Sequence, residues 1–201
     1  MKSVVLDIDN QLLVQEVEDP TPGLGEVLIR GAYAGVQWGD VMVRDGHMPV
    51  LRPFAPGFEV SGHVVAVGEG VDESRIGEQV AALTMSGAFA ELTVAPAILA
   101  IEANNIPLRT AGGFGWVTPA AYDLVNTVGR VQAGESVLIH AAAGGVGTLA
   151  VQFLTLAGRS RGVGGVGNET TKEKGQQFVL KVVVVRVGFT GGLDDDICDG
   201  Y

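Results

Sequence analysis

Short apolar and alternating runs, separated by turn residues, fill the first hundred positions of the chain. Each run is bounded by Gly, Ser or Pro, which is typical of strands joined by tight turns. The predicted strands are Ser3–Ile8, Leu12–Val17, Glu26–Ala34, Phe58–Val67, Glu78–Leu83 and Phe89–Val94. Their spacing predicts a compact β-barrel, closed or partly open, with one short helix at Gly39–Arg44.

The pattern changes near Ile106, after which predicted helices alternate with predicted strands. Thr118–Thr127 is predicted as a helix, with Thr118 as N-cap and Pro119 as its first residue. The elements that follow are strand Val137–His140, helix Gly147–Gly158, strand Arg161–Gly167, helix Glu169–Phe178 and strand Val182–Arg186. This alternation is typical of a parallel sheet with crossover helices. The fold class is therefore α/β with a β-barrel: a barrel domain at 1–115, then half of a doubly wound nucleotide-binding domain at 116–201.

Composition and charge narrow the class of protein. Lys and Arg number 13 against 23 Asp and Glu, and this net charge of −10 argues against nucleic acid as a partner. Hydrophobic residues make up 47% of the chain, which is enough for a packed core. The single cysteine, Cys198, permits no internal disulfide and fits a reducing compartment. Asp7 and Asp9 interrupt the apolar run that a signal peptide needs, so we expect a cytoplasmic protein.

Residues 136–158 carry no formal charge and are long enough for a membrane span. Glycine pairs interrupt this stretch, so it is better explained as a strand, a turn and a helix. We therefore expect no membrane partner.

The turn in that stretch, Ala141–Gly147, carries a nucleotide-binding pattern. Its small residues follow the spacing G-x-G-x-x-G, with alanine in the first position. They allow a tight turn, a close backbone approach to a pyrophosphate, and close packing of helix on strand. The helix N-terminus also offers free N–H groups to the phosphates. The candidate cofactor-binding residues are Ala141, Gly144, Gly145, Val146 and Gly147; a glycine-rich turn without a ligand remains the alternative.

The end of the following strand distinguishes NADP from NAD in such domains. Asn168 and Lys172 are candidate partners for a 2′-phosphate, and we favour NADPH over NADH on that basis. Glu169 remains an alternative partner for the ribose of NADH or a helix-starting residue.

The isolated histidines and Trp38 have structural explanations that we prefer. His140 is expected to be a hydrogen-bonded core residue at the end of a buried strand. His63 is expected on the surface of a strand, and His47, in a loop, is the one that could approach a substrate. Trp38 is expected to anchor the core, with stacking on a ligand as the alternative.

Four segments resemble one known family. They are GESVLIHAAAGGVGTLAVQ (134–152), PGLGEVLIRGAYAGV (22–36), WGDVMVRDG (38–46) and FAPGFEVSGHVVAVGEGV (54–71). The chain resembles the zinc-independent medium-chain dehydrogenases/reductases, in the quinone oxidoreductase and enoyl reductase branch. The resemblance implies a GroES-like barrel domain followed by a Rossmann domain, with NADPH bound between them. It further implies hydride transfer from NADPH to a quinone or an activated C=C bond.

The resemblance also implies particular site residues. Zinc-dependent members carry Cys where Gln37 stands and His where Phe58 stands, so no zinc site is expected. Gln37 matches an Asn near the nicotinamide ribose and the substrate, and Thr118 matches a position that approaches the nicotinamide. Gln37 and Thr118 are therefore the candidate catalytic residues, while Asp40 is expected to orient the loop around it.

The length departs from the family. Two domains of this kind need on the order of 300 residues, so the resemblance implies that 201 residues lack the second half of the Rossmann domain. The glycines in Ala111–Gly115 fall in a stretch that the family makes helical, which suggests that the pattern is breaking down there. Alternatives are a non-catalytic nucleotide- or partner-binding remnant, or a subunit completed by another chain or as a homodimer through an exposed strand.

Overall fold

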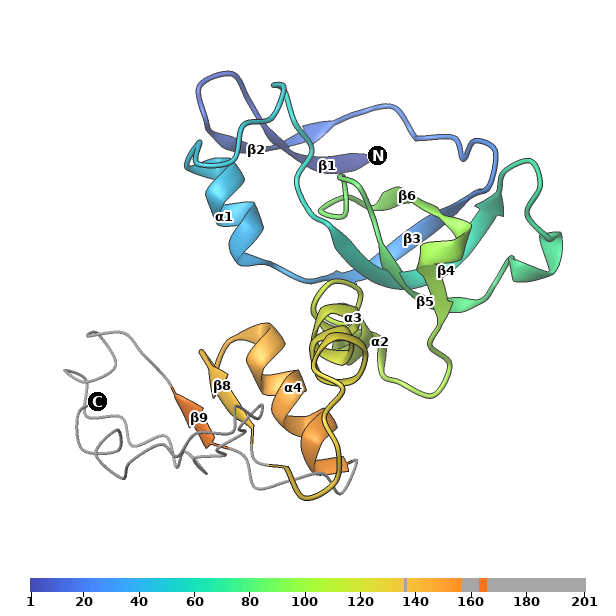
Figure 1. The fold of residues 1–201 in the computed structure, drawn as a ribbon. Helices are drawn as coiled ribbons and strands as arrows, with labels where there is room; N and C mark the ends of the chain where they lie inside the picture. The colour runs from blue at the N-terminus through green and yellow to red at the C-terminus, as the bar shows by residue number, and fades with distance from the viewer. Residues whose placement is uncertain (136, 157–162, 166–201) are drawn as a thin grey trace. The chain divides into compact units, whose positions relative to one another are not determined.

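The structure, a computed structural model, describes residues 1–135, 137–156 and 163–165. It divides into two compact units, Met1–Trp116 and Val117–Tyr201 (Figure 1). The predicted helix Glu169–Phe178 and strand Val182–Arg186 lie outside the described residues.

The first unit is built on an antiparallel sheet of five strands. Its strands are β3 (Glu26–Ala34), β4 (Glu59–Val67), β5 (Gln79–Leu83), β6 (Leu92–Pro96) and β7 (Ala100–Glu102). Their order is β6-β3-β4-β5-β7, so among the described strands the sheet is open at both edges. The predicted barrel is thus of the partly open kind, and the predicted bounds of β3 are confirmed.

Alternation along the central strands explains why this sheet forms. Val27 and Ile29 on β3 are fully buried while Arg30 is exposed, because successive side chains of a strand point to opposite faces. The inward residues form one cluster: Val27, Ile29, Val60, Val64, Val80, Ala82, Ala88, Ala95 and Ala100. Two register irregularities between β3 and β4, next to Ile29 and Tyr33, are the kind of bulge that bends a sheet.

A two-stranded hairpin precedes the sheet. It consists of β1 (Lys2–Leu6) and β2 (Leu12–Glu16), and every residue of β2 is exposed. The segment before β6 pairs with β1: the Val4 N–H donates to the Phe89 carbonyl at 2.8 Å, and the Glu91 N–H to the Lys2 carbonyl at 3.0 Å. The predicted strand Phe89–Val94 therefore starts too early, since its first residues serve the hairpin.

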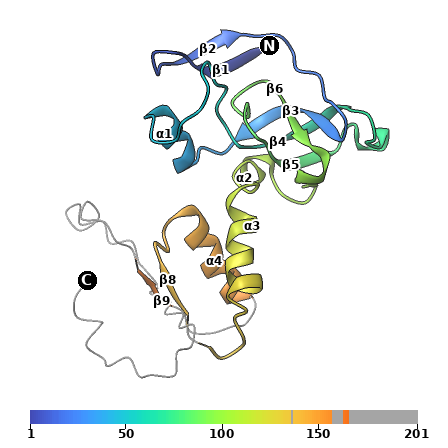
Figure 2. The ribbon, with the colours of Figure 1, turned by 45° about the horizontal axis from the view of Figure 1, so that its top comes forward.

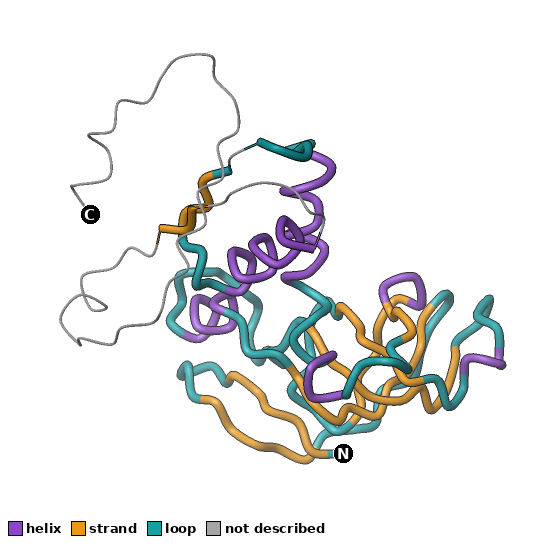
Figure 3. The backbone as a smooth tube through the Cα atoms, turned by 90° about the horizontal axis from the view of Figure 1, so that it is seen from below, coloured by secondary structure: helices purple, strands orange, loops and turns teal. Residues whose placement is uncertain are grey.

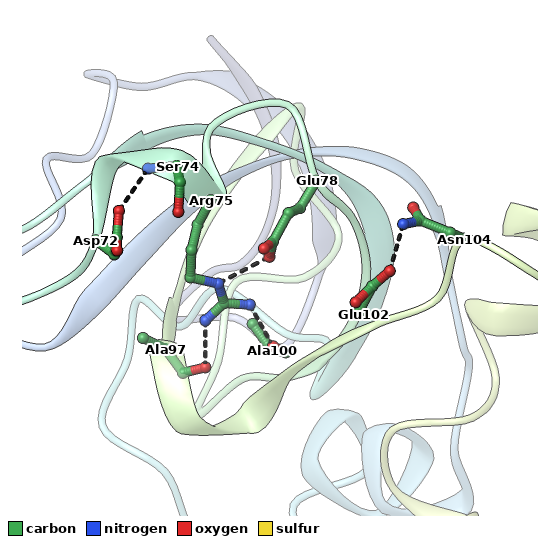
Figure 4. Close-up of polar contacts among 8 residues, drawn as sticks. All are labelled: Asp72, Ser74, Arg75, Glu78, Ala97, Ala100, Glu102 and Asn104. Carbon is green, nitrogen blue, oxygen red and sulfur yellow. Dashed lines mark hydrogen bonds and ion pairs between the residues drawn. The ribbon is translucent and has the colours of Figure 1, made fainter.

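Short helices connect the strands of this unit. They are α1 (Trp38–Arg44), η1 (Glu73–Arg75), η2 (Ala97–Leu99) and α2 (Leu108–Ala111), and α1 confirms the short predicted helix. Arg75 holds two of these connections together (Figure 4). Its guanidinium donates to Glu78 at 2.8 Å, to the Ala97 carbonyl at 2.8 Å and to the Ala100 carbonyl at 2.6 Å.

Two glycines after α2 are required by packing. A Cβ on Gly112 would lie 2.9 Å from Tyr33 Cβ, and one on Gly115 would lie 2.9 Å from the Ala82 carbonyl oxygen. Real Cβ atoms essentially never approach other atoms so closely. Residues 112–116 form a turn between α2 and α3, so the helix is interrupted here as the sequence suggested, and at these two positions glycine also lets the segment lie directly on the sheet.

In the residues that the structure describes, the second unit contains three helical segments and a parallel strand pair. They are α3 (Val117–Tyr122), the π-helix η3 (Asp123–Val128), β8 (Leu138–His140), α4 (Gly145–Leu156) and β9 (Val163–Gly165). In Figure 2 and Figure 3, α3 and α4 lie side by side, with β8 and β9 next to α4. The strand–helix–strand unit β8–α4–β9 confirms the predicted parallel pairing of this region.

The core of this unit is apolar. The prediction that Thr118 caps the first helix of the unit is wrong. Ala121, Val125, Val131, Val137, Ala150 and Leu154 form its buried cluster. Thr118 is the second residue inside α3 and not the N-cap, because the helix already begins at Val117. Of the helices that the structure describes, none is both long and apolar enough to cross a membrane.

Candidate functional site

The turn between β8 and α4 has the geometry that the glycine pattern predicts. Ala141 takes a left-handed conformation (φ 54°), and its carbonyl accepts the Gly144 N–H at 2.9 Å. Gly147 is buried, and a Cβ there would lie 2.7 Å from the Ala142 Cα and would also collide with the Ala141 carbonyl. Glycine at 147 therefore lets the first turn of α4 pack directly against the turn that leaves β8.

The same turn presents free donors on an accessible surface. The first N–H groups of an α-helix have no partner within the helix. Gly144 and Gly145, where α4 begins, are exposed. Side chains are absent at both positions, so a phosphate can approach the backbone closely, and the helix dipole favours its negative charge. The residues present thus fit a pyrophosphate group.

A cavity of about 500 Å³ adjoins this turn. Its described lining includes Ala141, Gly144 and Gly147 from the turn, with Ala150 and Leu154 from α4. Most of the lining is apolar. The turn therefore borders both solvent and an apolar recess, which is common for sites that bind a cofactor with a polar and a flat apolar part.

The other candidate region lies in the first unit, around a buried carboxylate. Glu59, at the start of β4, is 1% exposed. Its Oε1 accepts the side-chain amide of Gln37, and its Oε2 accepts the Trp116 backbone N–H at 2.9 Å. One carboxylate therefore holds both the Gln37 side chain and the Trp116 backbone. Gly35 makes room for it, since a Cβ there would lie 2.7 Å from Glu59 Cδ.

Burial raises the pKa of Glu59 above its ordinary value, because removal from water disfavours the charged form. Hydrogen bonds from the Trp116 backbone, the Gln37 amide and the Gly115 backbone act in the opposite direction on this pKa. The net shift is upward, so burial outweighs the donors. Glu59 is the functional-site candidate that sequence analysis missed, although a carboxylate at the head of an apolar strand pattern was its signal.

Asp40 ties the backbone of Gln37 to the backbone of Gly57. Gln37 is the N-cap of α1, and its N–H donates to Asp40 Oδ2 at 2.8 Å. Asp40 is 7% exposed, and its other oxygen accepts the Gly57 N–H at 3.1 Å. The expected loop-orienting role of Asp40 is confirmed. Gln37 is held at its backbone N–H by Asp40 and at its side-chain amide by Glu59.

Thr118, the second candidate catalytic residue, lies on α3 in the second unit. Its Oγ1 is buried and has no hydrogen-bond partner among the described residues. Leaving a buried hydroxyl unsatisfied costs about 1–3 kcal/mol. The Thr118 hydroxyl thus has no structural partner in the part of the chain that the structure describes.

Some of the predicted site residues lie together in the structure, and others lie outside the described residues. The five turn residues, Ala141, Gly144, Gly145, Val146 and Gly147, come together, whereas Asn168 and Lys172 lie outside the described residues. Two structural expectations are wrong. His140 is exposed rather than buried, and Trp38 is 74% exposed rather than a core anchor. His63 is exposed on its strand, as expected.

Comparison with known proteins agrees with this arrangement. Residues 23–105 match the alcohol dehydrogenase GroES-like domain. A probable quinone oxidoreductase of Schizosaccharomyces pombe is 35% identical over 166 residues, which cover 82% of this chain and 49% of that protein. The chain therefore spans about half the length of this curated relative.

Solved structures agree as well. A mycobacterial quinone oxidoreductase matches with a TM-score of 0.77 and 31% identity, covering 86% of this chain and 55% of that one. The quinone oxidoreductase of Thermus thermophilus, solved also in complex with NADPH, matches with a TM-score of 0.67 and 30% identity, covering 80% and 52%.

The GroES-like match in the first unit, the strand–turn–helix motif in the second and the quinone oxidoreductase relatives together define a medium-chain dehydrogenase/reductase. The chain belongs to that superfamily, and its relatives place it in the quinone oxidoreductase branch.

Proposed function

We propose that this chain binds NADPH and serves the reduction of a quinone or an activated C=C bond without zinc. The observation that carries the proposal is the turn Ala141–Gly147, whose close-packed Gly147 and exposed Gly144 and Gly145 fit a pyrophosphate. The quinone oxidoreductase relatives, one of them solved with NADPH, support the reaction class.

NADPH, when bound, supplies the hydride. The chain's own residues would bind the cofactor and orient it and the substrate. Backbone N–H groups at the start of α4 would hold the pyrophosphate, and the orphaned Thr118 hydroxyl is the proposed partner of the nicotinamide. The side-chain N–H₂ of Gln37 donates to Glu59, and its side-chain oxygen, which also belongs to the capping box of α1 with the Asp40 backbone, is the proposed acceptor for a ribose or substrate hydroxyl.

The preference for NADPH over NADH rests on the sequence and the relatives. Asn168 and Lys172 are the proposed partners of the 2′-phosphate. A titration calorimeter would compare NADPH with NADH, and Lys172→Ala is expected to weaken NADPH binding selectively. Equal losses for both nucleotides would contradict this assignment.

Independence from zinc is the second part of the proposal. Gln37 and Phe58 stand where the zinc-dependent relatives place Cys and His, and neither amide nor phenyl is a zinc ligand of the usual kind. Turnover is expected to survive dialysis against a chelator. Activity that is lost on dialysis and restored by Zn²⁺ would overturn this part.

The decisive experiment mixes the chain with NADPH and a panel of quinones and acyclic enones, and follows NADPH oxidation. Calorimetric binding of NADPH is measured in parallel, with Gly147→Ala as the variant that blocks the turn. Turnover supports the proposal. Binding without turnover favours the non-catalytic alternative. Absence of both binding and turnover overturns the proposed function. Sedimentation tests whether a second copy completes the chain, since the chain spans only about half of its relatives' length.

A further inference from the structure

An aromatic surface lies beside the Glu59 carboxylate in the first unit. The rings of Phe58 and Trp116 have centroids 5.5 Å apart with an interplanar angle of 49°. Phe54 continues the row, at 6.4 Å from Phe58. Trp116 is 47% exposed, so about half of this large side chain faces solvent while Phe58 supports it.

The position of Trp116 is fixed by its backbone as well as by its ring. Its N–H donates to Glu59 Oε2, and the other oxygen of the same carboxylate accepts the Gln37 amide. Gly115, immediately before it, lies so close to the Ala82 carbonyl that only glycine fits. Because the indole packs on Phe58 and its backbone is held, the Trp116 side chain loses little conformational entropy when a ligand stacks on it.

We propose that Trp116, backed by Phe58, is the stacking surface for the planar ring of the acceptor, and that it favours quinones over acyclic enones. The proposal rests on the proposed function and names the residue that sets its substrate class. Quinone rings are electron-poor and flat, whereas the indole face is electron-rich, so the two stack favourably. An acyclic enone offers no ring to this surface.

The distribution of tryptophans gives a direct binding assay. The chain has two, Trp38 and Trp116, and both are in the first unit. Duroquinone is a suitable probe, because all of its ring carbons are substituted and it cannot add a thiol such as that of Cys198. It is titrated without nucleotide into the full chain and into the Trp38→Phe and Trp116→Phe variants, and indole fluorescence is followed.

The expected result is specific to one indole. With Trp116 as the sole reporter, quenching should saturate; with Trp38 as the sole reporter, it should rise only linearly, as random collisions produce. Saturable quenching of Trp38 alone, or no saturable quenching in any form, overturns the proposal.

Affinities complete the test. Trp116→Leu keeps the backbone N–H bonded to Glu59 and removes only the ring. We expect it to weaken duroquinone binding about tenfold, which is about 1.4 kcal/mol, while Trp116→Phe stays within about threefold. An acyclic enone such as 3-penten-2-one, as the comparison, should bind the chain and the Leu variant equally. Phe58→Leu serves as a second variant, and its expected loss is smaller because it removes the support and not the surface.

The outcome separates the two proposals. If duroquinone saturates Trp116 but NADPH is never oxidised, the stacking surface stands and the proposed function falls. If quinones are reduced and Trp116→Leu leaves the duroquinone affinity and the quinone-to-enone ratio unchanged, the stacking surface alone is refuted.

Discussion

Replacing Glu59 by glutamine is a sharp test of how the first unit is held together. The carboxylate accepts hydrogen bonds from the Gln37 amide, the Trp116 backbone and the Gly115 backbone. Glutamine has nearly the same shape, but one of its two polar atoms is a donor. In Glu59→Gln, therefore, a donor faces a donor on one side of the site.

The magnitude follows from that mismatch. Position 59 is 1% exposed, so water cannot satisfy the donor that loses its acceptor. A buried unsatisfied polar group costs about 1–3 kcal/mol. With a urea dependence of about 2 kcal/mol/M for a unit of this size, a loss of about 2 kcal/mol lowers the unfolding midpoint by about 1 M.

Tryptophan fluorescence in urea measures this change, because both tryptophans belong to the Met1–Trp116 unit. The matched control is Glu69→Gln, at an exposed position, which should change stability by less than about 0.5 kcal/mol. A Glu59→Gln midpoint equal to that of the control would refute the bonding described for the carboxylate.

The pH dependence gives the same test a second readout. Burial raises the pKa of Glu59, so between its ordinary and its raised pKa the folded state binds more protons than the unfolded state. The stability that this group contributes is present below its ordinary pKa and is lost as pH rises through the raised one. The stability gap between the chain and Glu59→Gln should therefore be wider near pH 4.5 than at pH 7, and a gap that widens with pH would contradict the assigned direction.

Three further substitutions test other parts of the structure. Gly147→Ala should weaken NADPH binding at least tenfold, because its Cβ would collide with the preceding turn, whereas Gly113→Ala, with open space around it, should leave calorimetric affinity unchanged. Arg75→Met removes three hydrogen bonds and should cost about 1–3 kcal/mol in urea unfolding, against less than about 0.5 kcal/mol for exposed Arg109→Met. Thr118→Val should raise thermal stability slightly by deleting an unsatisfied hydroxyl and should weaken NADPH binding; unchanged binding would remove Thr118 from the site.

The strands of the first unit were largely predictable because their signals are local. Alternation along β3 and the apolar run of β4 set the bounds of both strands to within one residue. β7, at Ala100–Glu102, was not predicted, since three residues carry too little pattern and the strand exists by pairing with β5. The burial of a residue at the end of a strand could not be predicted either. His140 follows an apolar run, yet it is exposed, because exposure depends on what covers each face of the strand.

The candidate site likewise has one part that the sequence predicts and one part that it does not. The turn Ala141–Gly147 is a run of seven adjacent residues, and its tight bend and close helix packing are steric requirements that small residues at fixed spacing reveal. The Glu59 centre is assembled from distant parts of the chain, since its partners Gln37 and Trp116 are 22 and 57 residues away.

The sequence alone determined most of the strand pattern, the tight glycine-rich turn at Ala141–Gly147 and the family, because each depends on neighbouring residues or on motifs formed by adjacent residues. Tertiary structure decided that Glu59 holds Gln37 and Trp116 on one carboxylate, that the glycines at 112 and 115 are packing requirements, and that Trp116 presents its indole to solvent. These features arise only when the folded sheet brings separate segments within bonding distance, and no local pattern encodes such a meeting.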